Sequence, residues 1–108
     1  MSSSLQSLGV VGRLYPLIRS GEKTSTIRWR EKQIAPGPLQ FFNDDDPSQS
    51  IEVIAIACTE MPLSDAANFV GRADEWPDQI MLEGMREHYP EIELTSTVQV
   101  IEFKLPSI

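Results

Sequence analysis

The run IEVIAIACTE, residues 51–60, is the feature that most limits how this chain can fold. If the run is extended, the odd-numbered residues from Ile51 to Ala57 line one face with apolar side chains, because successive side chains of a strand alternate. Ile54 and Ile56 make the opposite face apolar as well. A strand that is apolar on both faces is typical of the interior of a sheet, so we expect this strand to lie centrally.

Three further strands are predicted over residues 24–29, 39–43 and 97–104, where β-branched or apolar residues alternate with polar ones. Apolar residues at helical spacing predict helices over residues 63–70 and 77–89. The strands are too few and too mixed with helices for a parallel doubly wound sheet. The order therefore predicts an α+β fold, a small curled sheet or open barrel with helices at its side.

A short helix is predicted before the first of these strands, in the segment RLYPLIRSG. Pro16 suits the first turn, where its missing N–H is harmless. Arg19 favours the negative C-terminal end of the helix, and Gly21 can adopt the left-handed conformation that ends it.

The chain has 108 residues, the size of one domain. Residues 1–8 are rich in serine, and we expect them to be mobile. The start lacks the basic and long apolar segments of a signal peptide, and no run approaches the ~20 apolar residues of a membrane span. The single cysteine, Cys58, cannot form a disulfide within the chain, so we expect a reducing, cytoplasmic setting.

The net charge is −7, from 9 Lys and Arg against 16 Asp and Glu. Proteins that bind long nucleic acids through phosphates usually carry a basic face, so this balance argues against broad RNA or DNA binding. The residues from Asp44 to Asp46 lack the ligand spacing of a calcium loop, and we interpret them as a solvated hairpin tip. With one histidine, His88, and one cysteine, an ordinary zinc site is not expected, and no metal or cofactor is predicted.

The stretch GEKTSTIRW, residues 21–29, is the candidate reaction site. On a regular strand Thr26 and Arg28 share one face, whereas Lys23 can join them only if the chain still turns near Gly21. A threonine hydroxyl is a poor nucleophile unless a base removes its proton. A lysine can be that base when desolvation or a nearby cation lowers its pKa. These residue types are also common on surface strands, so the stretch alone fits a purely structural strand as well.

The segment SGEKTSTIR resembles the signature of the ASCH domain, Gly-x-Lys-x-x-(small or hydroxyl)-x-Arg, with Gly21, Lys23, Thr26 and Arg28 in its four positions. The resemblance spans about residues 13–105 and includes YPLI, PGPLQFF and the tail HYPEIELTSTVQVIEFKL. It implies a PUA-like β-barrel, mostly antiparallel, with flanking helices. In size and tail the chain is most similar to the small bacterial N4-acetylcytidine amidohydrolases, which remove the acetyl group from the exocyclic nitrogen of cytidine.

Carried over to this sequence, the resemblance implies Lys23 as proton acceptor, Thr26 as nucleophile and an acidic residue as proton donor. Counting back from Tyr89 without gaps places the donor on Asp74, where the family has a glutamate. Glu75 follows directly. Asp74 is preferred, and Glu75 is the alternate donor.

A few residues are candidates for binding the substrate. Trp76 and Trp29 could stack on a pyrimidine or could pack in the core. Arg28 or a backbone N–H would hold the oxyanion of an acyl-transfer reaction. The expected partner is a small acylated nucleoside, with no membrane partner and the oligomeric state left open. The alternative is a non-catalytic RNA-binding or regulatory module in which Arg28, Lys23 and Lys32 contact phosphates, and RNA cleavage is a third.

Overall fold

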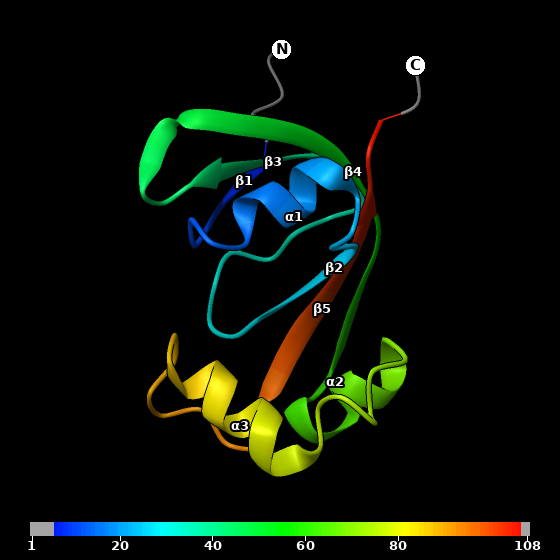
Figure 1. The fold of residues 1–108 in the computed structure, drawn as a ribbon. Coiled ribbons are helices and arrows are strands. Elements are labelled where there is room, and N and C mark those ends of the chain that lie inside the picture. The colour runs from blue at the N-terminus through cyan, green and yellow to red at the C-terminus, as the bar shows by residue number, and fades with distance from the viewer. Residues whose placement is uncertain (1–5, 107–108) are drawn as a thin grey trace. The chain divides into compact units, whose positions relative to one another are not determined.

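The computed structural model describes residues 6–106, and these residues form five strands and three helices. The strands make one mixed sheet in the order β1-β3-β4-β5-β2, and the α+β class predicted from the sequence is confirmed. In chain order (Figure 1) the elements are β1 (Gln6–Val10), α1 (Tyr15–Ser20), β2 (Ser25–Arg28), β3 (Gly37–Asn43), β4 (Asp46–Pro62), α2 (Leu63–Phe69), α3 (Asp78–Arg86) and β5 (Thr97–Lys104).

The apolar run identified in the sequence is the centre of β4, the middle strand of the sheet, as expected. β4 pairs in antiparallel fashion with β3, with Val53 opposite Leu39. Val53 and Ala55 are buried, but Ile56 is 53% exposed. The second apolar face of this central strand is therefore open to solvent at Ile56.

β1 is the strand that the sequence pattern did not predict. It pairs in parallel with β3, with Leu8 opposite Phe41. A parallel partner far along the chain leaves no local signal, because no hairpin turn joins the two strands. Of residues 1–8, which we expected to be mobile, residues 6–8 lie in β1, and residues 1–5 lie outside the described residues.

The chain packs as two compact units. The first consists of the described parts of residues 1–26, 34–58 and 101–108, and the second consists of residues 27–33 and 59–100. Each unit has its own cluster of buried apolar side chains.

The core of the first unit is formed by β1, α1, β3, β4 and the end of β5. Phe41 and Phe103 lie with their ring centres 5.0 Å apart in a tilted arrangement. Each fully buried Leu, Ile or Phe side chain stabilises the fold by about 1.5–3 kcal/mol. The buried members of this core are Leu8, Val10, Tyr15, Ile18, Ile34, Leu39, Phe41, Val53, Ala55, Ile101 and Phe103.

The acidic segment forms the tip of the β3–β4 hairpin, as predicted. The backbone N–H of Asp44 donates to Val10 O at 2.9 Å, which ties the tip to β1. A Cβ atom at Gly9 would lie 2.3 Å from Asp44 Oδ1, and one at Gly12 would lie 2.0 Å from Asp45 Oδ2. The two carboxylates thus lie directly against glycine backbone that has no side chain to oppose them.

The second unit contains α2, α3 and the first half of β5. The start of α2 is tied to the segment before β5, because Leu63 N–H donates to Ser96 O at 2.8 Å and Ser64 N–H donates to Leu94 O at 3.0 Å. α3 ends at Arg86, three residues earlier than the predicted helix. The buried members of this core are Leu63, Ala66, Ala67, Met81, Ile92, Val98 and Val100.

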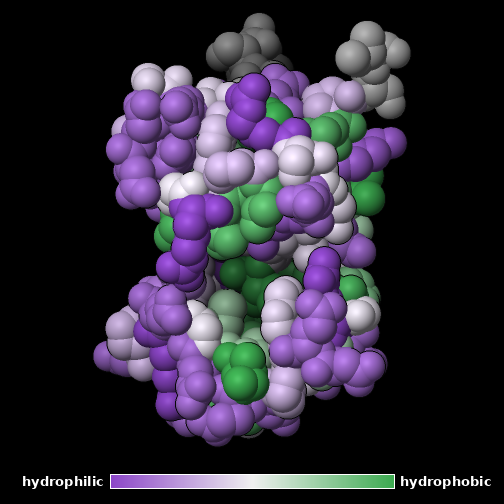
Figure 2. All heavy atoms as spheres, viewed as in Figure 1, coloured by the Kyte–Doolittle hydropathy of each residue, from purple (hydrophilic) through white to green (hydrophobic). Residues whose placement is uncertain are grey.

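Hydrophilic side chains dominate the face of the molecule seen in Figure 2. Charged residues make up 23% of the chain, and charged side chains are seldom fully buried in folded proteins. Among residues 6–106, no helix combines the length and the apolar character that crossing a membrane requires.

Candidate functional site

Lys23 lies in the short connection between α1 and β2. α1 ends at Ser20 and is capped by Gly21, which has a left-handed φ of 85° and donates its N–H to Ile18 O at 3.2 Å. The N–H of Lys23 then donates to Leu17 O at 3.0 Å, so the backbone is still bonded to the helix at this residue. β2 begins only at Ser25, so Lys23 lies before the strand. Its side chain therefore does not have to follow the alternating directions of side chains along the strand. The backbone thus still turns at Lys23, as expected, and the approach of its amine to the Thr26 hydroxyl stays a prediction.

Thr26 is the second residue of β2 and is only 6% exposed. Lys23 is half-buried and belongs to the same unit. A side-chain hydroxyl that is buried must be satisfied by partners other than bulk water, and no buried side-chain donor or acceptor among the described residues lacks a partner. The first unit thus contributes one lysine and one buried hydroxyl to the predicted set.

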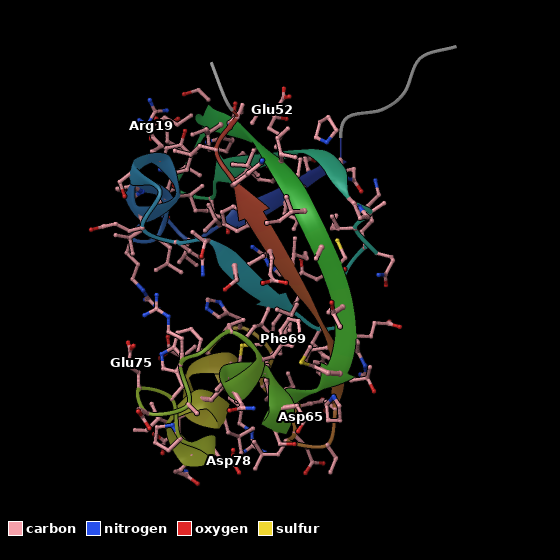
Figure 3. The ribbon with its side chains drawn as sticks, turned by 90° about the vertical axis from the view of Figure 1, so that its right-hand side faces the viewer. Arg19, Glu52, Asp65, Phe69, Glu75 and Asp78 are labelled. Carbon is pink, nitrogen blue, oxygen red and sulfur yellow. The ribbon has the colours of Figure 1, made fainter. Side chains whose placement is uncertain are left out.

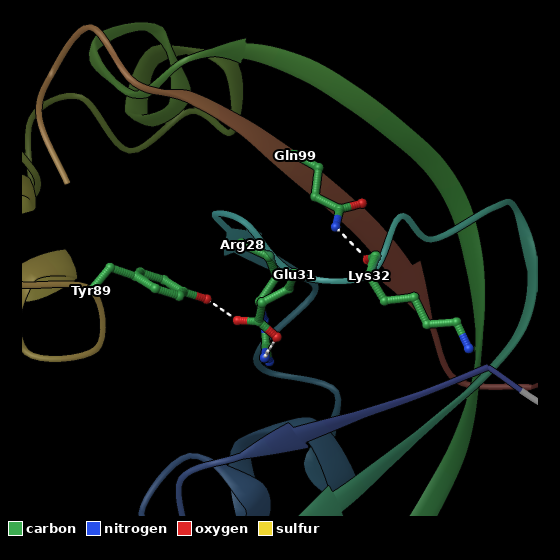
Figure 4. A network of polar contacts seen from close by, with 5 residues as sticks. All are labelled: Arg28, Glu31, Lys32, Tyr89 and Gln99. Carbon is green, nitrogen blue, oxygen red and sulfur yellow. Dashed lines mark hydrogen bonds and ion pairs between the residues drawn. The ribbon is translucent and has the colours of Figure 1, made fainter. Parts of the chain in front are cut away.

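Arg28 is the last residue of β2 and belongs to the second unit, where its side chain is 12% exposed. Its Nη1 donates to Glu31 Oε1 at 3.4 Å. The other carboxylate oxygen of Glu31 accepts a hydrogen bond from the phenol of Tyr89, as Figure 4 shows. We call these three side chains, Arg28, Glu31 and Tyr89, the carboxylate bridge, because Glu31 links the arginine to the tyrosine.

Tyr89 is held in place from several sides. Its N–H donates to Met85 O at 2.9 Å just after α3, and its ring meets the ring of Trp29 edge-on at 6.0 Å between centres. Burial, the hydrogen bond to Glu31 and the negative charge of Glu31 raise the pKa of Tyr89 from 10.0 to about 12, and the charge of Arg28 acts in the opposite direction. The phenol is therefore neutral at physiological pH and remains a hydrogen-bond donor to Glu31.

The residues on both sides of Glu31 are also held in place by contacts. Arg30 has a φ of 56°, a left-handed conformation that is uncommon outside glycine, and its guanidinium carbon lies 4.2 Å from the centre of the Trp29 ring. Lys32 O accepts a hydrogen bond from Gln99 Nε2 at 2.7 Å (Figure 4). Gln99 is 5% exposed, so this bond is shielded from water.

The two tryptophans pack in the second unit. Arg30 covers one face of Trp29, whose edge meets Tyr89, and both Trp29 and Trp76 pack against the core of this unit. The guanidinium carbon of Arg72 lies 5.8 Å from the centre of the Trp76 ring. For Trp29 these contacts favour the core-packing alternative over base stacking.

The two candidate acids lie in the connection between α2 and α3, and both are exposed. Glu75 accepts two hydrogen bonds from Arg72 Nη1, at 3.1 and 3.3 Å, and Figure 3 shows it at the outer edge of the second unit. The carboxylate of Asp74 makes no hydrogen bond or ion pair within residues 6–106. The two neighbours thus differ in that Glu75 is engaged by a cation and Asp74 is available to a ligand.

Cys58 and His88 take no part in the predicted set. Cys58 is half-buried, packs against the core of the first unit, and has a pKa raised by that burial. His88 is exposed, with its ring centre 6.3 Å from that of Tyr89. The part of the chain that the structure describes holds no group of three His, Cys, Asp or Glu side chains suited to a metal ion.

Sequence reasoning identified Arg28 but missed the residues that hold it. Glu31 lies only three positions after Arg28 and could have been found as its counter-charge. Tyr89 is 58 residues from Glu31, and no sequence pattern connects them. Of the predicted set, Lys23 and Thr26 belong to the first unit, and Arg28, Asp74, Glu75 and Trp76 belong to the second.

No protein-family model and no curated protein sequence matches this chain. Two solved structures of ZmASCH from Zymomonas mobilis, one a serine-to-alanine and one a tyrosine-to-phenylalanine variant, are similar to it, each with a TM-score of 0.67. Their sequence identities are 14% and 16%, and the matches cover 91% of this chain and 66% and 67% of the ZmASCH chains. This chain therefore spans about two thirds of the length of ZmASCH. The likeness confirms the ASCH fold that the sequence motif implied.

Proposed function

We propose that this chain, which has the fold of an ASCH protein, is an amidohydrolase that acts on N4-acetylcytidine or related N4-acylated cytosine nucleosides. The products are cytidine and a carboxylate. The observation that carries the proposal is the local geometry of the motif that begins at Gly21. The left-handed glycine ends α1, Lys23 is held outside the strand, and Thr26 is a buried hydroxyl within it.

In the first step, Lys23 in its neutral form accepts the proton of the Thr26 hydroxyl. The oxygen of Thr26 attacks the carbonyl carbon of the acyl group, and a tetrahedral intermediate with a negative oxygen forms. Arg28 or a backbone N–H donates to this oxygen and stabilises its charge. The buried position of the hydroxyl supports this step, because electrostatic interactions are stronger where water is excluded.

In the second step, the bond between the carbonyl carbon and the exocyclic nitrogen breaks. Asp74 donates a proton to the departing nitrogen, so that the leaving group is neutral cytidine. The acyl group remains on Thr26 as an ester. The Asp74 carboxylate takes a proton from the attacking water, Lys23 returns its proton to the departing oxygen of Thr26, and the acyl group leaves as the acid, which ionises to the carboxylate. Asp74 is supported over Glu75 because its carboxylate has no hydrogen-bond or ion-pair partner within residues 6–106, whereas Glu75 accepts two hydrogen bonds from Arg72.

The proposed steps use only groups of the protein and water, and no metal or cofactor takes part in them. The acidic net charge of −7 supports a substrate without a long phosphate backbone. The single cysteine supports a reducing compartment, and we place the activity in the cytoplasm.

The test is direct incubation of the purified protein with N4-acetylcytidine, with chromatography to follow the release of cytidine and acetate. We expect turnover in the wild-type protein that changes little between low and high salt, because the nucleoside carries no charge. The Thr26→Val variant keeps the side-chain shape without the hydroxyl and is expected to be inactive. A protein that releases no cytidine but binds RNA with an affinity that falls steeply with salt would contradict the proposal and favour the RNA-binding alternative.

A further inference from the structure

The carboxylate bridge joins the one motif arginine to a tyrosine that lies outside the motif. Glu31 accepts from Arg28 Nη1 through one oxygen and from the phenol of Tyr89 through the other. A guanidinium has five N–H donors, and the contact with Glu31 uses one nitrogen, Nη1. The bridge therefore restrains the arginine through one end of its guanidinium.

The restraint on Glu31 comes from its surroundings as well as from its own hydrogen bonds. The left-handed backbone of Arg30, with its guanidinium over Trp29, turns the chain immediately before Glu31. The carbonyl of Lys32, immediately after it, is held by the buried side chain of Gln99. The carboxylate is thus positioned by contacts on both of its neighbours.

The far end of the bridge is equally well anchored. Tyr89 follows α3 directly, its N–H donates to Met85 O, and Ile92 N–H donates to Tyr89 O at 3.0 Å. Its ring packs edge-on against Trp29. Because the phenol of Tyr89 is fixed in this way, its hydrogen bond can hold the Glu31 carboxylate in one orientation. The carboxylate in turn restricts the motion of the Arg28 guanidinium.

We propose that Glu31 and Tyr89 are positioning residues that hold the Arg28 guanidinium in the orientation in which it donates to the acyl oxygen of the substrate. This inference rests on the proposed amidohydrolase function, to which it adds two residues that do not contact the substrate. An arginine side chain that is ordered before binding loses less conformational freedom when the transition state forms. The bridge would thus hold Arg28, the proposed oxyanion donor, in its working orientation before the substrate binds.

The first test is a double-mutant cycle on kcat/KM for N4-acetylcytidine with Arg28→Ala, Tyr89→Phe and the double variant. We expect Tyr89→Phe to lower kcat/KM about tenfold, since it removes a hydrogen bond to a charged group. In the Arg28→Ala background the same change is expected to have no further effect, because the residue that Tyr89 positions is gone. Additive losses would show a merely structural role and would overturn the inference.

Matched controls are present in the chain. Tyr15 is the second tyrosine, lies in the first unit, and accepts a hydrogen bond from Arg19 Nη1 at 3.3 Å. Glu83 is an exposed glutamate on α3 that accepts from Gln79 Nε2 at 3.0 Å. Tyr15→Phe is the control for Tyr89→Phe, because each variant loses one phenol hydroxyl. Glu83→Gln is the control for Glu31→Gln, the variant that removes the carboxylate charge of the bridge. Both controls are expected to retain wild-type kcat/KM, and a loss equal to that of the bridge variants would contradict a specific role of the bridge.

A second measurement separates this inference from the proposed function. The side-chain ¹⁵N–¹H signals of Arg28, assigned with the Arg28→Lys variant, report the order of the guanidinium without any turnover. We expect them to be sharp in the wild type and broadened in Tyr89→Phe and Glu31→Gln, while the folded state is retained in thermal melts. Signals of Arg28 that are unchanged in both variants would overturn the inference. An inactive wild type in which these signals still depend on Tyr89 would overturn the proposed function and retain the positioning of Arg28.

Discussion

The phenol of Tyr89 donates a hydrogen bond to the carboxylate of Glu31, across 58 residues of sequence. This bond connects the turn after α3 with the segment after β2, and through Glu31 it reaches Arg28. The tyrosine is therefore part of the surroundings of the motif even though it lies far from it in the chain.

The first prediction concerns the ionisation of Tyr89. The Tyr15→Phe protein has Tyr89 as its only tyrosine, so its tyrosinate absorbance near 295 nm reports this residue alone. We expect a midpoint at about pH 12, because burial and the Glu31 carboxylate raise the pKa of Tyr89. Adding Glu31→Gln removes the negative charge and is expected to move the midpoint toward the ordinary tyrosine value. An unchanged midpoint would show that Glu31 does not act on the phenol.

A second prediction follows from the same group and concerns stability against pH. In the unfolded chain Tyr89 ionises near its ordinary pKa of 10.0, whereas in the folded protein it does so at about 12. Between these values the unfolded state releases a proton that the folded state retains, so the free energy of unfolding falls as the pH rises from 10 to about 12. Urea denaturation should show this decline in the wild type and a shallower one in Tyr89→Phe. Equal slopes in the two proteins would contradict the raised pKa.

The third prediction tests the pairing of Lys23 with Thr26. If Lys23 accepts the proton of Thr26, each single loss should lower kcat by at least about 100-fold, and the double variant should be little worse than either one, since the residues act as a unit. Lys23→Met and Thr26→Val keep much of the side-chain volume, and Thr26→Ser should retain part of the activity. Activity near the wild-type level in a folded Thr26→Val protein would end the assignment of Thr26 as nucleophile.

The fourth prediction separates the two candidate donors. Asp74→Asn should lower kcat by about 10²–10⁴-fold, the usual contribution of a general acid, while Glu75→Gln should lose much less. The loss in Asp74→Asn should shrink for substrates whose amines leave more readily, because these need less protonation. The inverse ranking of the two variants would assign the proton to Glu75 and would mean that its pair with Arg72 opens during the reaction.

The fifth prediction uses two glycines that respond in opposite directions to the same substitution. Gly21 has a φ of 85°, so Gly21→Ala places a side chain in the left-handed region and should destabilise the protein by about 1–2 kcal/mol. Gly84 lies within α3, and among the described residues no atom other than those of its chain neighbours and the nearby helix backbone lies within 4 Å of the position of an added Cβ. Gly84→Ala should therefore stabilise the protein by up to about 1 kcal/mol through helix propensity. Denaturant titration measures both, and a neutral Gly21→Ala would contradict the need for glycine at this motif position.

The sequence by itself determined the elements whose signals are local. Pro16 and Gly21 mark the ends of α1, and each has a conformational preference that acts within one turn. The alternation in β4 and β5 depends only on the two-residue repeat of an extended chain, so both strands were predicted. The ASCH motif is equally local, because four residues within eight positions carry it.

Only the tertiary structure decided the features that depend on distant partners. β1 is a strand because it pairs in parallel with β3, and Ile56 is exposed although it lies on an apolar face of the central strand. Arg28 was recognisable from the motif, but the bridge to Tyr89 through Glu31 exists only because packing brings the end of α3 to the segment after β2. Hydrogen bonds and packing contacts act over a few ångströms in space, whatever the separation of the residues along the chain. A local sequence pattern therefore cannot predict contacts between distant residues.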